Sequence, residues 1–122
     1  MPSEGPSAPL LDPAAIETLR KVAGNQGDGF VAEMAQLFLE ETTKSLRDLR
    51  EGCDRGDWKV VARVAHSVKS SSATLGLMRL SEACRDLEFH TQGAGSTPGT
   101  VALAASVIEQ FEHAVPTLKG LS

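Results

Sequence analysis

Apolar side chains recur at every third or fourth position along most of this sequence. The pattern is clearest in four stretches, at about residues 28–53, 58–75, 77–91 and 101–115. Because an α-helix turns once in about 3.6 residues, this spacing gathers the apolar side chains on one face of each helix. The pattern therefore predicts four long helices, each with one buried side.

A shorter helix is predicted ahead of these four. Asp12 can cap its first turn, Pro13 suits the position after the cap, and the glycine-bounded segment 24–27 ends it near residue 23. Its predicted apolar stripe consists of Ile16, Leu19 and Val22.

The buried faces of the long helices can be read from the same spacing. On 28–53 we expect Phe30, Met34, Leu37, Phe38, Leu46, Leu49 and Cys53 to face inward; on 77–91, Leu80, Ala83, Cys84 and Leu87; on the last helix, Val101, Ala104, Ala105, Ile108, Phe111 and Val115. Pro116 is expected to end or kink that last helix, because proline has no backbone N–H.

Four amphipathic helices joined by short turns bury their stripes most simply as an antiparallel four-helix bundle. The predicted fold class is therefore all-α, with the short N-terminal helix covering one end. Residues 1–10 contain three Pro and two Ser, so we expect a flexible arm there and a single bundle domain over 11–120.

The composition agrees and excludes several classes of protein. The chain has 122 residues with four Phe, one Trp and no Tyr, which is poor in the aromatic residues that sheets favour. A net charge of −4 without a basic block argues against nucleic-acid binding. No apolar run approaches the ~18 residues of a membrane span, and the start lacks the features of a signal peptide. Two cysteines, Cys53 and Cys84, fit buried reduced thiols, so we expect a cytoplasmic protein.

One histidine lies away from the predicted core. On the helix at 58–75 the apolar stripe consists of Val61, Val64, Ala65, Val68, Ser72 and Leu75. His66 lies more than ~100° from the centre of that stripe, so it is predicted to point to solvent. Its neighbours at spacings of three and four residues are Ala62, Arg63, Lys69 and Ser70, and the small ones leave room for another protein to approach.

A neutral imidazole is a good nucleophile toward phosphorus. A phosphoryl group on His66 would carry about two negative charges, and Lys69 could neutralise part of them. The sequence shows no glycine-rich phosphate loop and implies no cleft, so the pattern favours a phosphoryl carrier over an enzyme. On spacing alone, however, an ordinary solvated helix face is the more frequent explanation.

Residues 65–76 read AHSVKSSSATLG. This segment resembles the signature of histidine-containing phosphotransfer (HPt) domains, in which Ala-His is followed by a lysine three residues after the histidine and by a closing glycine. His66, Lys69 and Gly76 match those positions, and the resemblance covers about residues 11–118. The family usually has Gly directly after the lysine, where this chain has Ser70. Serine is small enough to keep access, and its hydroxyl could donate a hydrogen bond to the imidazole or the phosphoryl group.

The resemblance implies a carrier of a two-component phosphorelay. A receiver domain's phospho-aspartate would donate to Nε2 of His66, and a second receiver's aspartate would take the group away. The implied partners are response-regulator receiver domains and a hybrid sensor histidine kinase; Mg²⁺ would belong to the receiver, and this chain would need no cofactor or metal and act as a monomer. The residues expected to line the contact are Lys59, Ala62, Arg63, Lys69, Ser70 and Ala73, with apolar surface from Phe38 or Leu39.

Two alternatives stay open at this point. The first is a helical protein-interaction module without phosphoryl chemistry. The second is a metal-binding bundle, because Asp86 with His90 and Glu109 with His113 have the i, i+4 spacing that can chelate a metal on an inward face. The Glu-x-x-His pairs of di-iron bundles are missing, and solvated helix faces explain these pairs more simply.

Overall fold

The computed structural model describes residues 10–93 and 98–121, and every regular element within these ranges is a helix. The elements are α1 (Pro13–Ala23), the 3-10 turn η1 (Gly24–Gln26), α2 (Gly27–Arg55), α3 (Trp58–Thr74), α4 (Met78–Gly93) and α5 (Pro98–Leu121). The predicted all-α class is confirmed. The arm predicted at 1–10 lies outside the described residues except for Leu10, as does the middle of the loop predicted at 93–99.

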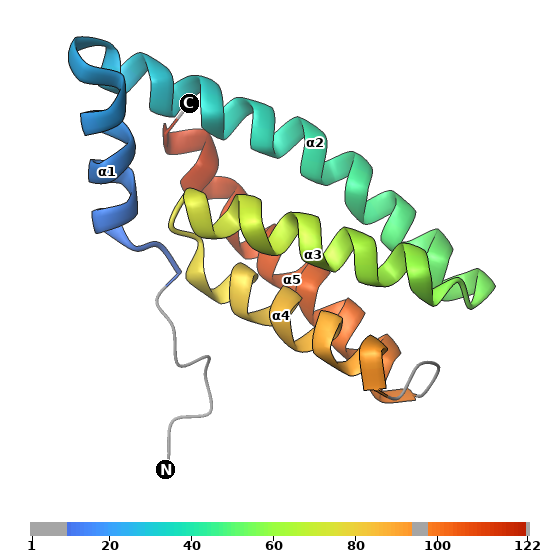
Figure 1. Ribbon diagram of the computed structural model, residues 1–122. Coiled ribbons are helices and arrows are strands. Elements are labelled where there is room, and N and C mark those ends of the chain that lie inside the picture. Colours follow the sequence, from blue (N-terminus) through green and yellow to red (C-terminus); the bar gives the residue numbers. More distant parts are fainter. Residues whose placement is uncertain (1–9, 94–97, 122) are drawn as a thin grey trace.

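The four long helices form a bundle. Helix α2 packs against α3 and α5, and α4 packs against the same two helices. Figure 1 shows each of these helices running opposite to the one before it, with α1 lying crosswise at the end of the bundle where α2 begins. The edge between α3 and α4 therefore lies opposite the edge between α2 and α5, and this opposition decides which surfaces a partner can cover together.

The core is built from aliphatic side chains of all four helices. Leu49, Val61, Leu80, Leu87 and Leu118 are among its fully buried members. Phe38 of α2 and Phe111 of α5 meet with ring centroids 6.3 Å apart. Most of the predicted inward residues are confirmed as buried or partly buried, so the periodicity of the sequence located the helix faces correctly.

Four apolar residues that were predicted to face the core are instead exposed: Val22, Leu37, Val101 and Ala105. Leu37 shows the physical reason. The buried stripe of α2 passes through Val31, Ala35, Phe38 and Thr42, which places Leu37 at its border, where 55% of the residue is exposed. A helical wheel gives the direction of a stripe, but its width depends on how closely the neighbouring helix approaches.

Pro116 does not end the last helix, since α5 continues to Leu121. An end of the helix at Pro116 was therefore wrongly expected, because tertiary packing outweighs one missing backbone hydrogen bond; a kink there stays a prediction. Ala114 and Leu118, two residues to either side, are both fully buried, so the helix is held against the bundle before and after the proline.

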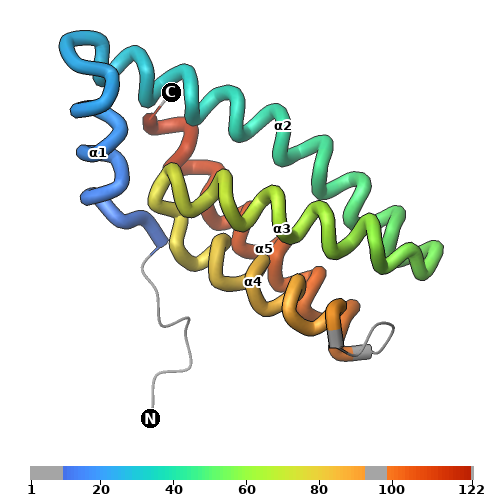
Figure 2. The backbone as a smooth tube through the Cα atoms, viewed as in Figure 1, coloured from blue at the N-terminus to red at the C-terminus, as the bar shows by residue number. Residues whose placement is uncertain are grey.

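The turn between α3 and α4 is fixed by a glycine and by the start of α1. Gly76 has φ +77°, and a Cβ atom there would lie 2.6 Å from the Asp12 carbonyl oxygen. The Asp12 backbone N–H donates to the Gly76 carbonyl at 2.7 Å, and Figure 2 shows the chain entering α1 beside this turn. Only glycine suits both the left-handed backbone and the close approach. The turn thereby sets how α3 and α4 are aligned along their shared edge.

Candidate functional site

His66 lies on the outer side of α3 with 64% of its side chain exposed, which confirms the predicted orientation toward solvent. Directly beside it in the chain, Ala65 is fully buried, and Val64 and Val68 are buried as well. The helix therefore presents the imidazole from a backbone that is held rigidly by the core.

The imidazole is oriented by a carboxylate from the next helix. Nδ1 of His66 lies 2.8 Å from Oε2 of Glu88, a residue of α4 whose side chain is only 15% exposed. The other oxygen, Oε1, accepts a hydrogen bond from the Lys69 ammonium at 2.7 Å. One carboxylate thus joins the histidine and the lysine across the α3–α4 edge.

The electrostatics of this triad keep Glu88 ionised. The hydrogen bond from Lys69 lowers the pKa of Glu88 most strongly, and that from His66 lowers it further, against the opposing effect of partial burial. An ionised carboxylate can only accept hydrogen bonds. The proton of neutral His66 must therefore lie on Nδ1, which leaves the lone pair of Nε2 directed away from Glu88, and within the described residues Nε2 has no partner.

Lys69 lies one turn from His66, and its side chain turns toward Glu88 and is 31% exposed. Its backbone carbonyl accepts hydrogen bonds from the hydroxyls of Ser72 and Ser81, both at 3.1 Å. Ser81 belongs to α4, so this bond ties the two helices together next to the triad. The ammonium retains donors beyond the one given to Glu88, so it can serve a second anion beside His66.

Ser70 and the predicted contact residues surround His66 on the same helix. Ser70 is exposed, as are Lys59, Arg63 and Ala73, and Ala62 is partly buried. The predicted hydrogen bond from the Ser70 hydroxyl to the imidazole is absent from the contacts of the described residues, since the ring is held by Glu88 instead. A hydrogen bond from the Ser70 hydroxyl to a phosphoryl group on His66 stays a prediction.

An apolar groove runs between α2 and α3 beside this face. It has a volume of about 240 Å³ and is lined by Met34, Leu37, Phe38, Glu41, Ser71, Thr74 and Leu75. The apolar surface expected from Phe38 or Leu39 is supplied mostly by Leu37, because Phe38 is only 5% exposed and Leu39 is half-buried. Apolar area next to a reactive side chain is typical of a protein-docking surface.

The residue pairs of the metal hypothesis do not assemble into a ligand set. Asp86 is exposed and lies 3.5 Å from the Arg85 guanidinium, and Nε2 of His113 lies 4.0 Å from Glu109 on the surface of α5. Across residues 10–93 and 98–121, no group of three or more His, Cys, Asp or Glu side chains is placed to hold a metal ion. No helix there is long and apolar enough to cross a bilayer.

Glu88 is the site residue that sequence reasoning missed. It comes 22 residues after His66, and no local spacing connects the two. A usable signal was present, since Ser81 and Glu88 are seven residues apart on α4 and so share one border of its buried stripe. That border is the one that faces Lys69.

Comparisons with known proteins agree with this geometry. The family model described as "Hpt domain" matches residues 33–121. Among solved structures, histidine-containing phosphotransfer protein B from Pseudomonas aeruginosa PAO1 is similar with a TM-score of 0.81 and 24% identity, over 93% of this chain and 95% of that one. A proposed histidine-containing phosphotransfer protein from rice is similar with a TM-score of 0.78 and 20% identity, over 92% and 79% of the two chains. A search of curated proteins found no significant match.

Proposed function

Since this chain belongs to the Hpt domain family, whose role is histidine phosphotransfer in two-component relays, we propose that His66 is the residue that carries the phosphoryl group. The observation that supports this most directly is the triad geometry. The ionised Glu88 holds Nδ1 of an exposed imidazole, so the other ring nitrogen has a lone pair that faces solvent. His113, for comparison, lies 4.0 Å from Glu109 on the surface of α5, which is a looser contact than the 2.8 Å between His66 and Glu88.

The transfer needs no separate base. Nε2 of neutral His66 attacks the phosphorus of an aspartyl phosphate on a receiver domain; the P–Nε2 bond forms and the P–O bond to the aspartate breaks. The aspartate leaves as a carboxylate, and the ring gains a positive charge with its proton still on Nδ1. Nδ1–H donates a hydrogen bond to Oε2 of Glu88, with 2.8 Å between the nitrogen and the oxygen. The carboxylate thereby stabilises the positive charge that develops on the ring. Attack by a second aspartate on the phosphorus reverses these changes.

Lys69 has two roles in this proposal. Its ammonium lies 2.7 Å from Glu88 and keeps that carboxylate ionised, and its remaining donors can bind a phosphoryl oxygen on His66. A charge-assisted hydrogen bond of this kind is roughly twice as strong as a neutral one. The site thus balances one negative carboxylate with one ammonium before the phosphoryl group arrives.

The partners follow from the same surface. HPt proteins work with receiver domains and histidine kinases, and we propose a hybrid sensor histidine kinase and response-regulator receivers as the partners of this chain. They would dock over α3 and the groove that includes Leu37, with Lys59, Ala62, Arg63 and Ala73 around His66. Both Lys59 and Arg63 are exposed and suit the negative charge that a phospho-aspartate brings.

The remaining properties are those of a carrier. We propose that the chain is not itself an enzyme, has no resident cofactor or metal, and acts in the cytoplasm as a monomer. Mg²⁺ would be bound by the receiver domain. A carrier of this kind needs one exposed acceptor on a rigid helix, because the residues that enclose the reacting groups during transfer are supplied by the partner.

The test is transfer of labelled phosphate from a phosphorylated receiver domain to the purified chain. His66→Gln is expected to abolish an acid-labile label, because the amide of glutamine is not a nucleophile comparable to imidazole. His113→Gln is the matched control: its imidazole is also exposed, with 54% of the side chain accessible, and labelling should be unchanged. Label on the His66→Gln variant would show that the proposed acceptor is wrong.

A further inference from the structure

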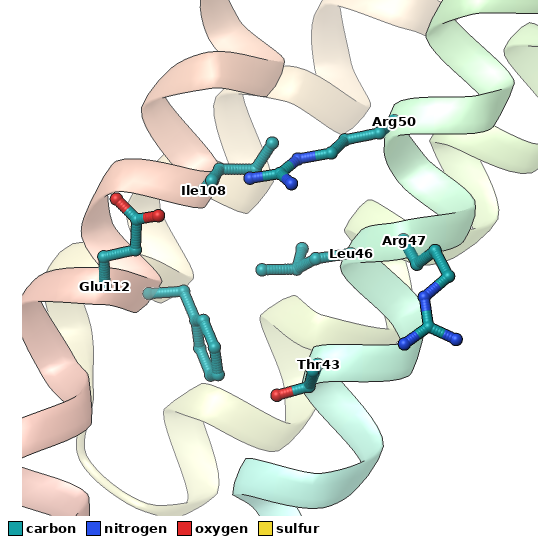
Figure 3. Close-up of a pocket in the computed structure, with 7 residues that line it drawn as sticks. Thr43, Leu46, Arg47, Arg50, Ile108 and Glu112 are labelled. Atoms are coloured by element: carbon teal, nitrogen blue, oxygen red, sulfur yellow. The ribbon is translucent and has the colours of Figure 1, made fainter.

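A second groove lies on the edge of the bundle opposite the His66–Glu88 edge. It runs between α2 and α5, has a volume of about 270 Å³, and is lined by Thr43, Leu46, Arg47, Arg50, Ile108, Phe111 and Glu112. Figure 3 shows Arg50 reaching over Ile108, with Leu46 between the two helices. The proposed phosphotransfer reaction uses none of these residues.

The floor of this groove is apolar and preformed. Leu46 is 5% exposed and Phe111 is 7% exposed, so both are fixed in the core and offer only their outer edges. Ile108 is half-buried beside them. A partner side chain placed here would cover apolar area without any rearrangement of the bundle.

The positive charges on the α2 wall form no ion pairs within the part of the chain that the structure describes. Arg47 and Arg50 are exposed, and neither forms an ion pair among the described residues. Other arginines, namely Arg20, Arg55 and Arg85, do pair with carboxylates. A guanidinium presents a rigid fork of donors that fits a carboxylate in bidentate geometry. The guanidinium groups of Arg47 and Arg50 lie three residues apart on one helix, next to the apolar base of the groove. This arrangement is complementary to two carboxylates that flank an apolar side chain.

The shape of the groove favours a helix as the occupant. The lining residues repeat at Thr43, Arg47 and Arg50 on α2 and at Ile108 and Glu112 on α5, so the groove follows the two antiparallel helices for about two turns. The i, i+3 spacing of the arginines corresponds to a rise of about 4.5 Å, which matches carboxylates one turn apart on a facing helix. The row of side chains on a third helix can lie between two packed helices.

We propose that the α2–α5 groove binds an acidic amphipathic helix of a partner protein, with an apolar side chain on Leu46, Ile108 and Phe111 and two carboxylates on Arg47 and Arg50. Glu112 on the opposite wall then faces the other border of that helix and favours a basic residue there. Because the groove lies opposite the α3–α4 edge, a partner held in it leaves His66 accessible. The groove would keep a partner attached while receivers exchange at the histidine.

The probe is a synthetic 16-residue helical peptide with leucines at every third or fourth position and glutamates along one border of that stripe. Titration into the ¹⁵N-labelled full chain should shift the amide resonances of α2 and α5 around the groove, with an affinity that falls as salt is raised. The double variant Arg47→Ala/Arg50→Ala should weaken binding at least tenfold. Lys59→Ala/Arg63→Ala removes the same charge from α3 and should leave the affinity unchanged.

The proposal would be overturned by equal binding of the peptide to the arginine double variant, by equal binding of a peptide whose glutamates are replaced by lysine, or by no shift at millimolar peptide. Shifts confined to the α2–α3 groove would also contradict it, because the peptide would then occupy the face of His66. Labelling of the arginine double variant by a phosphorylated receiver is measured in parallel and should equal that of the unaltered chain. The peptide titration therefore tests the groove alone, and the labelling experiment tests His66 as the acceptor, so failure of one proposal can be told from failure of the other.

Discussion

Replacement of Glu88 by alanine is expected to slow phosphotransfer to His66 by about tenfold. The lost interaction is a hydrogen bond of 2.8 Å between Nδ1 and a carboxylate that is only 15% exposed. A hydrogen bond to a charged group contributes about 1.5–3 kcal/mol. Because His66 is 64% exposed, water replaces part of this interaction, and we take the lower limit. A barrier raised by ~1.4 kcal/mol corresponds to a rate about tenfold lower.

Glu88→Gln separates charge from geometry. The glutamine carbonyl can still accept the hydrogen bond from Nδ1, but a neutral acceptor retains roughly half of the free energy of a charge-assisted bond. The expected loss of rate is therefore about threefold, between the unaltered chain and Glu88→Ala.

The assay is the initial rate of label transfer from a phosphorylated receiver, with ¹⁵N NMR of the His66 ring as an independent readout. The unaltered chain should show the proton on Nδ1, and Glu88→Ala should show a mixture of the two tautomers. Glu33→Ala on α2 is the control, because it removes an exposed carboxylate far from the triad in sequence. A folded Glu88→Ala protein that transfers at the original rate, with the proton still on Nδ1, would refute the reasoning.

Other expected results follow from features of the same fold. Lys69→Ala should slow labelling several-fold and lower the free energy of unfolding by about 1 kcal/mol in urea denaturation, because its ion pair is partly exposed; complete unfolding would contradict that placement. Gly76→Ala should lower the free energy of unfolding by about 2–4 kcal/mol in the same urea denaturation, since φ is +77° and Cβ would meet the Asp12 carbonyl. An unchanged denaturation midpoint would exclude the strain. The lowered pKa of Glu88 adds stability that is fully present above the pKa of an unfolded glutamate, about 4.3, and is lost as the pH falls through the folded pKa. Acid titration should therefore destabilise the unaltered chain more than Glu88→Gln, and parallel curves would be the contrary result. Burial raises the pKa of Cys84 to about 12 and raises that of Cys53 less, so iodoacetamide should modify Cys53 first, and preferential labelling of Cys84 would show that the core is open.

Much of the fold was predictable because the helices are regular and their turns are marked. Asp12 and Asp57 accept hydrogen bonds from the first turns of α1 and α3, and Gly56 ends α2 in the left-handed conformation. These local signals determine where a helix begins and ends. Leu37 was assigned wrongly, and Pro116 does not end its helix, because both outcomes depend on neighbouring helices, whose approach no local pattern contains.

The candidate site was predictable only in part for a similar reason. The position of His66 on α3 follows from the periodicity of one helix. Its partner Glu88 follows from the alignment of two helices, which the Gly76 turn and its contact with Asp12 fix. Lys69 was predicted to lie beside His66, and it does lie one turn away, but the carboxylate on α4 draws its ammonium inward.

The exposed position of His66 also has a consequence for timing. With 64% of the side chain accessible, a phosphoryl group on Nε2 would be hydrated between encounters, and its survival would follow the intrinsic hydrolysis of a phosphoramidate in water. Protein partners associate with rate constants of about 10⁵–10⁷ M⁻¹s⁻¹, so at ~1 μM a receiver arrives every ~0.1–10 s. The lifetime of phosphorylated His66 would then be set by the concentration of receivers, so the expression level of the partner would determine how long the phosphoryl group stays on this chain.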